Sequence, residues 1–265
     1  MAFFPLASIQ NTKGYTRVHN FSPNQWELTD VTKKTLWAIF SNGEHWKTKE
    51  LATLEVGESQ TYYYDQILPL KERVRQPLIL LQFRRTPLAS KLETLPAHEF
   101  SYSKLPEWRA TVGFQLNKAQ TSYQGEINPF PNKASLLTFH PFIQYDRTHN
   151  YLVVFNAEKS PVAREANLEI YNSASKELID KVVLHNNCVN VIALDQYTFT
   201  PQELPVFVSR NMAGIPFGFG ISHANDMLSL EHTHPPASFV VHGERFKVQG
   251  EIKKRWFDVL KEFKT

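Results

Sequence analysis

Short apolar runs, each closed by a polar turn, recur along the whole chain. These runs are rich in β-branched and aromatic side chains, which pack well on a pleated sheet. Four of them are residues 35–40, 78–83, 151–155 and 166–171. In the last run Glu169 lies between Leu168 and Ile170, so apolar and polar positions alternate as in a strand with one solvent-facing side. The pattern predicts antiparallel strands joined by turns.

Helices are disfavoured over most of the chain, because its 16 prolines interrupt every long segment. The C-terminus is the exception, since Ile252, Trp256, Leu260 and Phe263 would share one helix face. Gly250 is expected to precede this helix. We therefore expect an all-β fold of the antiparallel β-sandwich type, Ig-like or jelly-roll-like, with a short amphipathic helix at the end.

Parts of the chain resemble one another in the same order, which indicates an internal duplication. The segment Gly113–Pro131 aligns without gaps with Gly218–Pro236 and shares Gly-Phe, Ala, Glu and Pro positions. Upstream of these segments, Asp65-Gln66 and Asp195-Gln196 each end an apolar run. Another pair of apolar runs, 36–40 and 152–155, precedes them. Two related domains in tandem are the simplest explanation.

The duplication predicts the domain boundaries. We expect a first β-sandwich over residues 12–131, a second over 132–243, and the C-terminal helix within 244–265. A Pro-containing insertion at about 84–109 would belong to the first domain alone, because the second has a much shorter segment there. Long loops of this kind often carry function.

Composition narrows the class of protein. With 42% hydrophobic and 21% charged residues the chain is not disordered, and no apolar stretch is long enough to span a membrane. The net charge of +3 is too small to predict nucleic-acid binding. The short N-terminal apolar stretch lacks the features of a signal peptide, so a cytoplasmic location is expected. The single cysteine, Cys188, excludes an internal disulfide framework.

Histidines are the first candidates for chemistry. His232 and His234 are two residues apart on an expected strand, so their rings would lie on one face and could supply half of a site for zinc or another divalent metal. His223 and His242 are the further candidate ligands. The alternative is a pair of core histidines satisfied by hydrogen bonds.

Aromatic and acidic residues are candidates for ligand binding. Exposed rings stack on sugars, and this singles out Trp46, Tyr63 and Trp108. Glu126 and Glu231 occupy equivalent positions in the gapless alignment and complete the set of candidate ligand-binding residues.

Three classes of function remain open. The first is a non-catalytic binding or assembly module that recognises a saccharide or a protein partner and forms homo-oligomers through exposed sheet edges. The second is a metal-dependent enzyme centred on His232 and His234. The third is a structural component of a virion or a surface.

Overall fold

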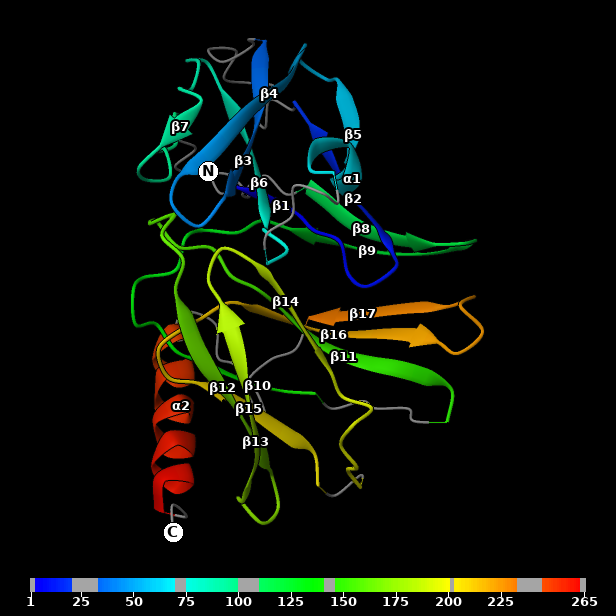
Figure 1. The fold of residues 1–265 in the computed structure, drawn as a ribbon, viewed down its shortest axis with the longest axis vertical. Coiled ribbons are helices and arrows are strands. Elements are labelled where there is room, and N and C mark those ends of the chain that lie inside the picture. Colours follow the sequence, from blue (N-terminus) through cyan, green and yellow to red (C-terminus); the bar gives the residue numbers. More distant parts are fainter. Residues whose placement is uncertain are drawn as a thin grey trace.

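The computed structural model describes residues 3–20, 33–69, 75–99, 110–140, 146–200, 203–232 and 245–262. Strands dominate these ranges, as the apolar runs predict, and they form four antiparallel sheets (Figure 1). The four predicted runs correspond to strands β3, β6, β11 and β12, with Leu78 alone lying just before its strand. The structure confirms the expected mostly β fold with antiparallel sheets and a C-terminal helix.

The first two sheets come from the first half of the chain. Their elements are β1 (Phe4–Leu6), β2 (Lys13–His19), β3 (Lys34–Ser41), β4 (Trp46–Leu54), β5 (Ser59–Tyr63), the one-turn helix α1 (Tyr64–Ile67), β6 (Ile79–Arg84), β7 (Lys91–Leu92), β8 (Ala110–Leu116) and β9 (Ala119–Gly125). The strand orders are β1-β6-β3-β4-β7 and β5-β2-β8-β9. Side chains from both sheets contribute to one apolar cluster, which includes Val18, Leu36 and Phe83.

The other two sheets come from the second half. Their elements are β10 (Leu136–Phe139), β11 (Thr148–Phe155), β12 (Glu165–Asn172), β13 (Leu178–His185), β14 (Val189–Ala193), β15 (Pro205–Ser209), β16 (Ile215–Ser222), β17 (Leu228–His232) and the helix α2 (Arg245–Glu262). The strand orders are β10-β15-β12-β13 and β14-β11-β16-β17. Side chains from both of these sheets contribute to a second apolar cluster, which includes Leu152, Ile170 and Phe207.

The strand orders of the two halves correspond element by element. The order β1-β6-β3-β4 matches β10-β15-β12-β13, and β5-β2-β8-β9 matches β14-β11-β16-β17, while β7 has no counterpart. The residue alignment holds less well. Leu116 pairs with Ala119 across a short turn, whereas Ile221 pairs with Leu228 across a longer one, so the gapless alignment loses register after this turn.

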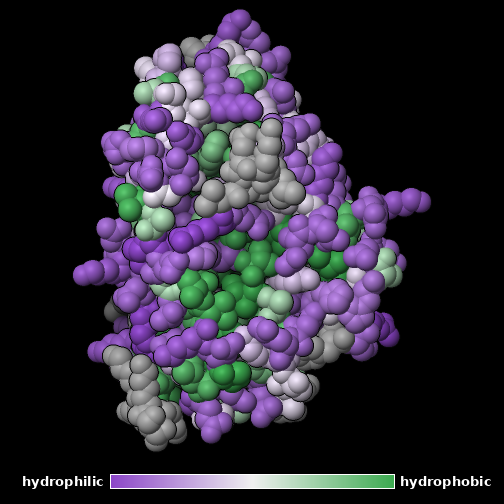
Figure 2. All heavy atoms as spheres, viewed as in Figure 1, coloured by the Kyte–Doolittle hydropathy of each residue, from purple (hydrophilic) through white to green (hydrophobic). Residues whose placement is uncertain are grey.

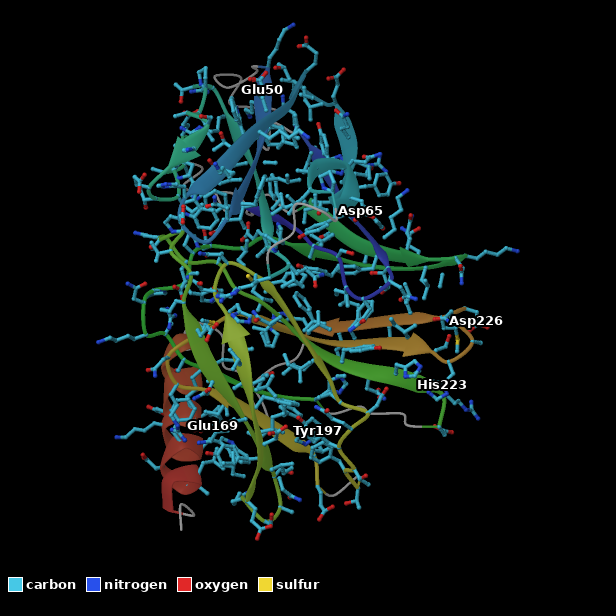
Figure 3. All side chains as sticks on the ribbon, viewed as in Figure 1. Glu50, Asp65, Glu169, Tyr197, His223 and Asp226 are labelled. Atoms are coloured by element: carbon cyan, nitrogen blue, oxygen red, sulfur yellow. The ribbon has the colours of Figure 1, made fainter. Side chains whose placement is uncertain are left out.

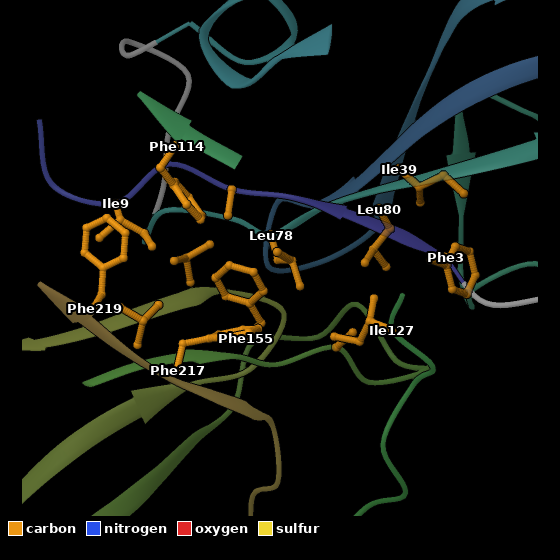
Figure 4. Packing of buried hydrophobic residues seen from close by; sticks show 14 of the residues in the cluster. Phe3, Ile9, Ile39, Leu78, Leu80, Phe114, Ile127, Phe155, Phe217 and Phe219 are labelled. Carbon is orange, nitrogen blue, oxygen red and sulfur yellow. The ribbon is translucent and has the colours of Figure 1, made fainter. Parts of the chain in front are cut away.

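An apolar cluster also joins the two halves. It contains Phe114 and Leu80 from the first half and Phe155, Phe217 and Phe219 from the second (Figure 4). The Phe114 and Phe219 rings pack edge to face, with centroids 5.4 Å apart. Both halves therefore bury apolar surface against each other, and their relative placement contributes to stability.

Hydrogen bonds fix the same junction along one side. The Trp46 indole Nε1 and the Leu95 backbone N–H both donate to the Lys159 carbonyl oxygen, at 3.0 and 3.1 Å. The Ala163 N–H donates to the Gly43 carbonyl oxygen at 2.8 Å. Leu95 belongs to the described part of the predicted insertion 84–109, so this part of the insertion contacts the second half.

The helix α2 packs on the outer face of the sheet β10-β15-β12-β13 (Figure 1). Leu260 is fully buried there against Val206 and Val208, and Ile252 and Trp256 pack beside it. Gly250 lies inside the helix and does not precede it, which corrects the predicted start. A single interior glycine costs only about 1 kcal/mol, and a packed apolar face outweighs it.

Candidate functional site: a groove and a histidine pair

A groove of about 530 Å³ lies along the β16 and β17 strands of the second half. Gly218 and Gly220 form its floor, and β17 pairs them with Glu231 and Ser229 respectively. Because directly opposed residues share one face of a sheet, these four residues point to the same side. The two glycines are themselves buried, because the His140 imidazole covers Gly218 and the Ser229 hydroxyl covers Gly220.

Polar side chains from β11 and β17, together with His140 just after β10, surround this floor. Asn150 on β11 pairs with Gly220, which places Asn150, Gly220 and Ser229 in one row across the sheet. The His140 imidazole lies over Gly218, where a Cβ would be 2.7 Å from its Nε2 atom. Hydroxyl, amide, imidazole and carboxylate groups therefore converge on one concave surface. Such groups fix the orientation of small polar ligands.

Among these groove residues, only Glu231 was predicted from the sequence. His140 and Asn150 were missed, because they precede β16 and β17 by many residues. Strand pairing brings Asn150 to β16, whereas His140 comes from the end of a strand in the other sheet. A signal for the floor was present: glycines two residues apart leave one face of a strand without side chains.

The predicted histidine site is not assembled among the described residues. His232 is exposed at one end of the β16-β17 hairpin, opposite Phe217, with the two rings 5.4 Å apart. His223 lies in the turn at the other end of the hairpin (Figure 3). His234 and His242 lie outside the described residues. The described ranges contain no group of three or more His, Cys, Asp or Glu side chains suited to a metal ion.

The candidate aromatic residues differ in exposure. Trp46 has no exposed surface, which corrects the expectation that its ring is available for stacking. Its indole is instead held at the junction between the halves. Tyr63 is half-buried on the outer face of its sheet, with the Lys13 ammonium 4.0 Å from its ring centroid. Trp108 lies outside the described residues.

Glu126 and Glu231 are not structurally equivalent. Glu126 follows β9 and is half-buried, whereas Glu231 is exposed within β17. The longer β16-β17 turn removes the correspondence that the gapless alignment suggested. Only Glu231 lines the groove.

A second polar cluster lies beside the groove. His149 Nδ1 is 2.8 Å from Asp195 Oδ2, and the backbone N–H of Asn150 donates to Asp195 Oδ1 at 2.9 Å. The rings of His149 and His223 are 4.6 Å apart. The sequence analysis named His223 as a ligand candidate and did not find its neighbour on β11.

Asp195 is expected to make the fold sensitive to acid. Partial burial by itself raises the pKa of its carboxyl, but hydrogen bonds from the Asn150 N–H and the His149 ring outweigh this, and the net pKa is below the usual 3.8. A carboxyl whose pKa is lowered by folding contributes its full stabilisation at pH values above its unfolded-state pKa. This contribution is lost as the pH falls through the folded-state pKa. In the Asp195→Asn variant the free energy of unfolding should therefore decrease less as the pH is lowered below about 4. Urea unfolding at several pH values measures this. An unchanged acid profile would contradict the assignment.

Cys188 is not a candidate nucleophile. Burial raises the pKa of its thiol to about 12, although the nearby Arg75 charge acts in the opposite direction. The reactive thiolate form is therefore scarce at neutral pH.

Comparison with known proteins adds no information on function. The chain matches no protein-family model, no curated protein and no solved structure. Within the described residues, no helix combines the length and apolar character needed to cross a membrane.

Proposed function

We propose that the chain is a non-catalytic binding module that holds a saccharide in the groove of the second half. The observation that carries this proposal is a groove of about 530 Å³ lined by the polar groups of Asn150, Ser229 and Glu231. A sugar offers many hydroxyl groups, each able to donate and accept hydrogen bonds. Side chains of mixed donor and acceptor character along a groove suit such a ligand.

The proposal includes two duplicated β-sandwich domains. It is supported by the matching strand orders and by the apolar cluster that the two sheets of each half share.

The proposal also includes self-association through a sheet edge, as expected of an assembly module. Among the described strands β13 pairs only with β12, and Ile179 and Val183 on it are 42% and 49% exposed. A free edge with exposed apolar side chains favours pairing with another copy.

Glu231→Ala should weaken saccharide binding at least about tenfold, because a hydrogen bond to a charged group contributes about 1.5–3 kcal/mol. Ser229→Trp should abolish binding by filling the groove. The probes are maltotriose, cellotriose and N-acetylchitotriose, titrated separately into the full chain. Binding is measured by calorimetry and by changes in amide NMR shifts of Gly218 and Gly220.

Glu177→Ala is the matched control, since Glu177 is an exposed glutamate on the β12-β13 turn, away from the groove. It should leave the affinity unchanged. If none of the three sugars shifts the Gly218 and Gly220 resonances, or if Ser229→Trp binds as tightly as the unchanged chain, the proposal is wrong.

A further inference from the structure

We propose that His149 and His223 form a binding site for a divalent transition metal ion, with Asp195 as a positioning residue. This site is separate from the groove, and its assignment does not depend on the proposed function. The site supplies two protein nitrogen ligands, with water completing the coordination.

Strand pairing places both imidazoles on one face of the sheet. His149 on β11 pairs with Ile221 on β16, and His223 is two residues beyond Ile221. Residues two apart along an extended strand point to the same side. The backbone N–H of His223 donates to the Arg147 carbonyl oxygen at 2.9 Å, which continues the strand pairing past the end of β16. Figure 3 shows His223 at the end of this hairpin, where Asp226 is also labelled.

The distance between the rings suits a shared metal ion. The centroids are 4.6 Å apart and the ring planes are inclined by 53°. Two imidazoles bound to one ion at about 2.0–2.1 Å, with a ligand–metal–ligand angle between square and tetrahedral, have centroids roughly 5 Å apart. Small rotations of the two side chains are therefore sufficient. Half of the His149 side chain is exposed, so an ion can reach it from solvent.

Asp195 prepares His149 to act as a ligand. Its Oδ2 atom contacts His149 Nδ1, so in the neutral ring the proton is held on Nδ1 and the lone pair is left on Nε2. The other carboxylate oxygen accepts the Asn150 N–H. With both oxygens engaged, Asp195 orients the ring without binding the ion itself. A carboxylate in this role is typical of metal-binding histidines.

The expected metal preference follows from the ligands. Two imidazoles and water suit Cu²⁺, Ni²⁺ and Zn²⁺, and divalent affinities generally peak at Cu²⁺. A site with only two protein ligands is expected to bind more weakly than the three- or four-ligand sites of zinc proteins. We therefore expect Cu²⁺ to bind more tightly than Zn²⁺.

The test is titration of the untagged full chain with CuCl₂ and ZnCl₂ in a non-coordinating buffer at pH 7.5. Calorimetry gives the affinity, and electron paramagnetic resonance of the copper complex reports nitrogen coupling. His149→Gln and His223→Gln should each weaken Cu²⁺ binding at least tenfold and reduce the nitrogen coupling. Asp195→Asn should weaken it about 10- to 100-fold, as for other residues that orient a ligand.

His19→Gln is the matched control, because His19 is an exposed strand histidine in the first half. It should bind copper as the unchanged chain does. Equal copper affinity in the unchanged chain, His149→Gln and His223→Gln would overturn the proposal, as would a complete lack of copper binding. Circular dichroism of each variant verifies that the fold is retained. The copper titration is independent of the saccharide proposal, so the result of one experiment does not decide the other.

Discussion

Replacing Phe217 with alanine is expected to lower the free energy of unfolding by about 3–5 kcal/mol. Phe217 is almost fully buried in the apolar cluster that joins the two halves. Its ring lies 4.7 Å from the Tyr123 ring of the first half and 5.0 Å from the Phe155 ring of the second. Truncation removes contacts on both sides and leaves a cavity that neighbouring strands cannot readily fill.

Urea unfolding followed by tryptophan fluorescence and far-ultraviolet circular dichroism measures this effect. Val162→Ala is the control, since Val162 is 59% exposed, and it should change stability by no more than about 0.5 kcal/mol. A loss below about 1 kcal/mol for Phe217→Ala would mean that the junction between the halves is not tightly packed in solution.

Gly14→Ala should be about as damaging, with a loss of about 3 kcal/mol or more, or failure to fold. A Cβ at Gly14 would lie 1.6 Å from the carbonyl oxygen of Ala7 and 3.1 Å from the Ser8 Cα atom. These are backbone atoms, so no side-chain rotation relieves the overlap, and overpacking against backbone is costly. The facing segment is held in place, because the Ser8 hydroxyl donates to the Thr12 carbonyl oxygen at 2.9 Å.

Gly250→Ala provides the opposite expectation with the same chemical change. Gly250 lies inside α2, and nothing is within 4 Å of a Cβ placed there. Alanine should therefore stabilise the chain by about 0.5–1 kcal/mol. Both variants are compared by thermal unfolding. If Gly14→Ala were as stable as the unchanged chain, the close approach of β2 to residues 7–8 would be wrong.

Local pattern was a good guide where a residue's neighbours along the chain decide its environment. The predicted strands at 35–40 and 166–171 formed because β-branched and aromatic runs bury well in a sheet whatever their partner. The predicted start of α2 was wrong, because Gly250 was taken as a helix boundary and lies inside the helix. A glycine is a weak signal when the flanking helix has an apolar face to bury.

The sites were harder to predict, because their members are distant in sequence. Trp46 looked like a stacking residue beside a turn, but a hydrogen bond to Lys159 and the packing of the second half bury it completely. His223 was grouped with His232 on the basis of proximity in sequence. The hairpin places these two at opposite ends, and strand pairing brings His149 to His223 instead.

By itself, the sequence determined that this protein is built from antiparallel strands and ends in an amphipathic helix, since both follow from the periodicity of apolar positions. The sequence also indicated that the two halves repeat the same order of elements. Only the tertiary structure decided that the two halves share a core, that Gly218 and Gly220 form the floor of a groove, and that Asp195 orients His149. These features depend on strand register and turn length. A few residues added to one turn alter both without changing the periodicity of apolar positions.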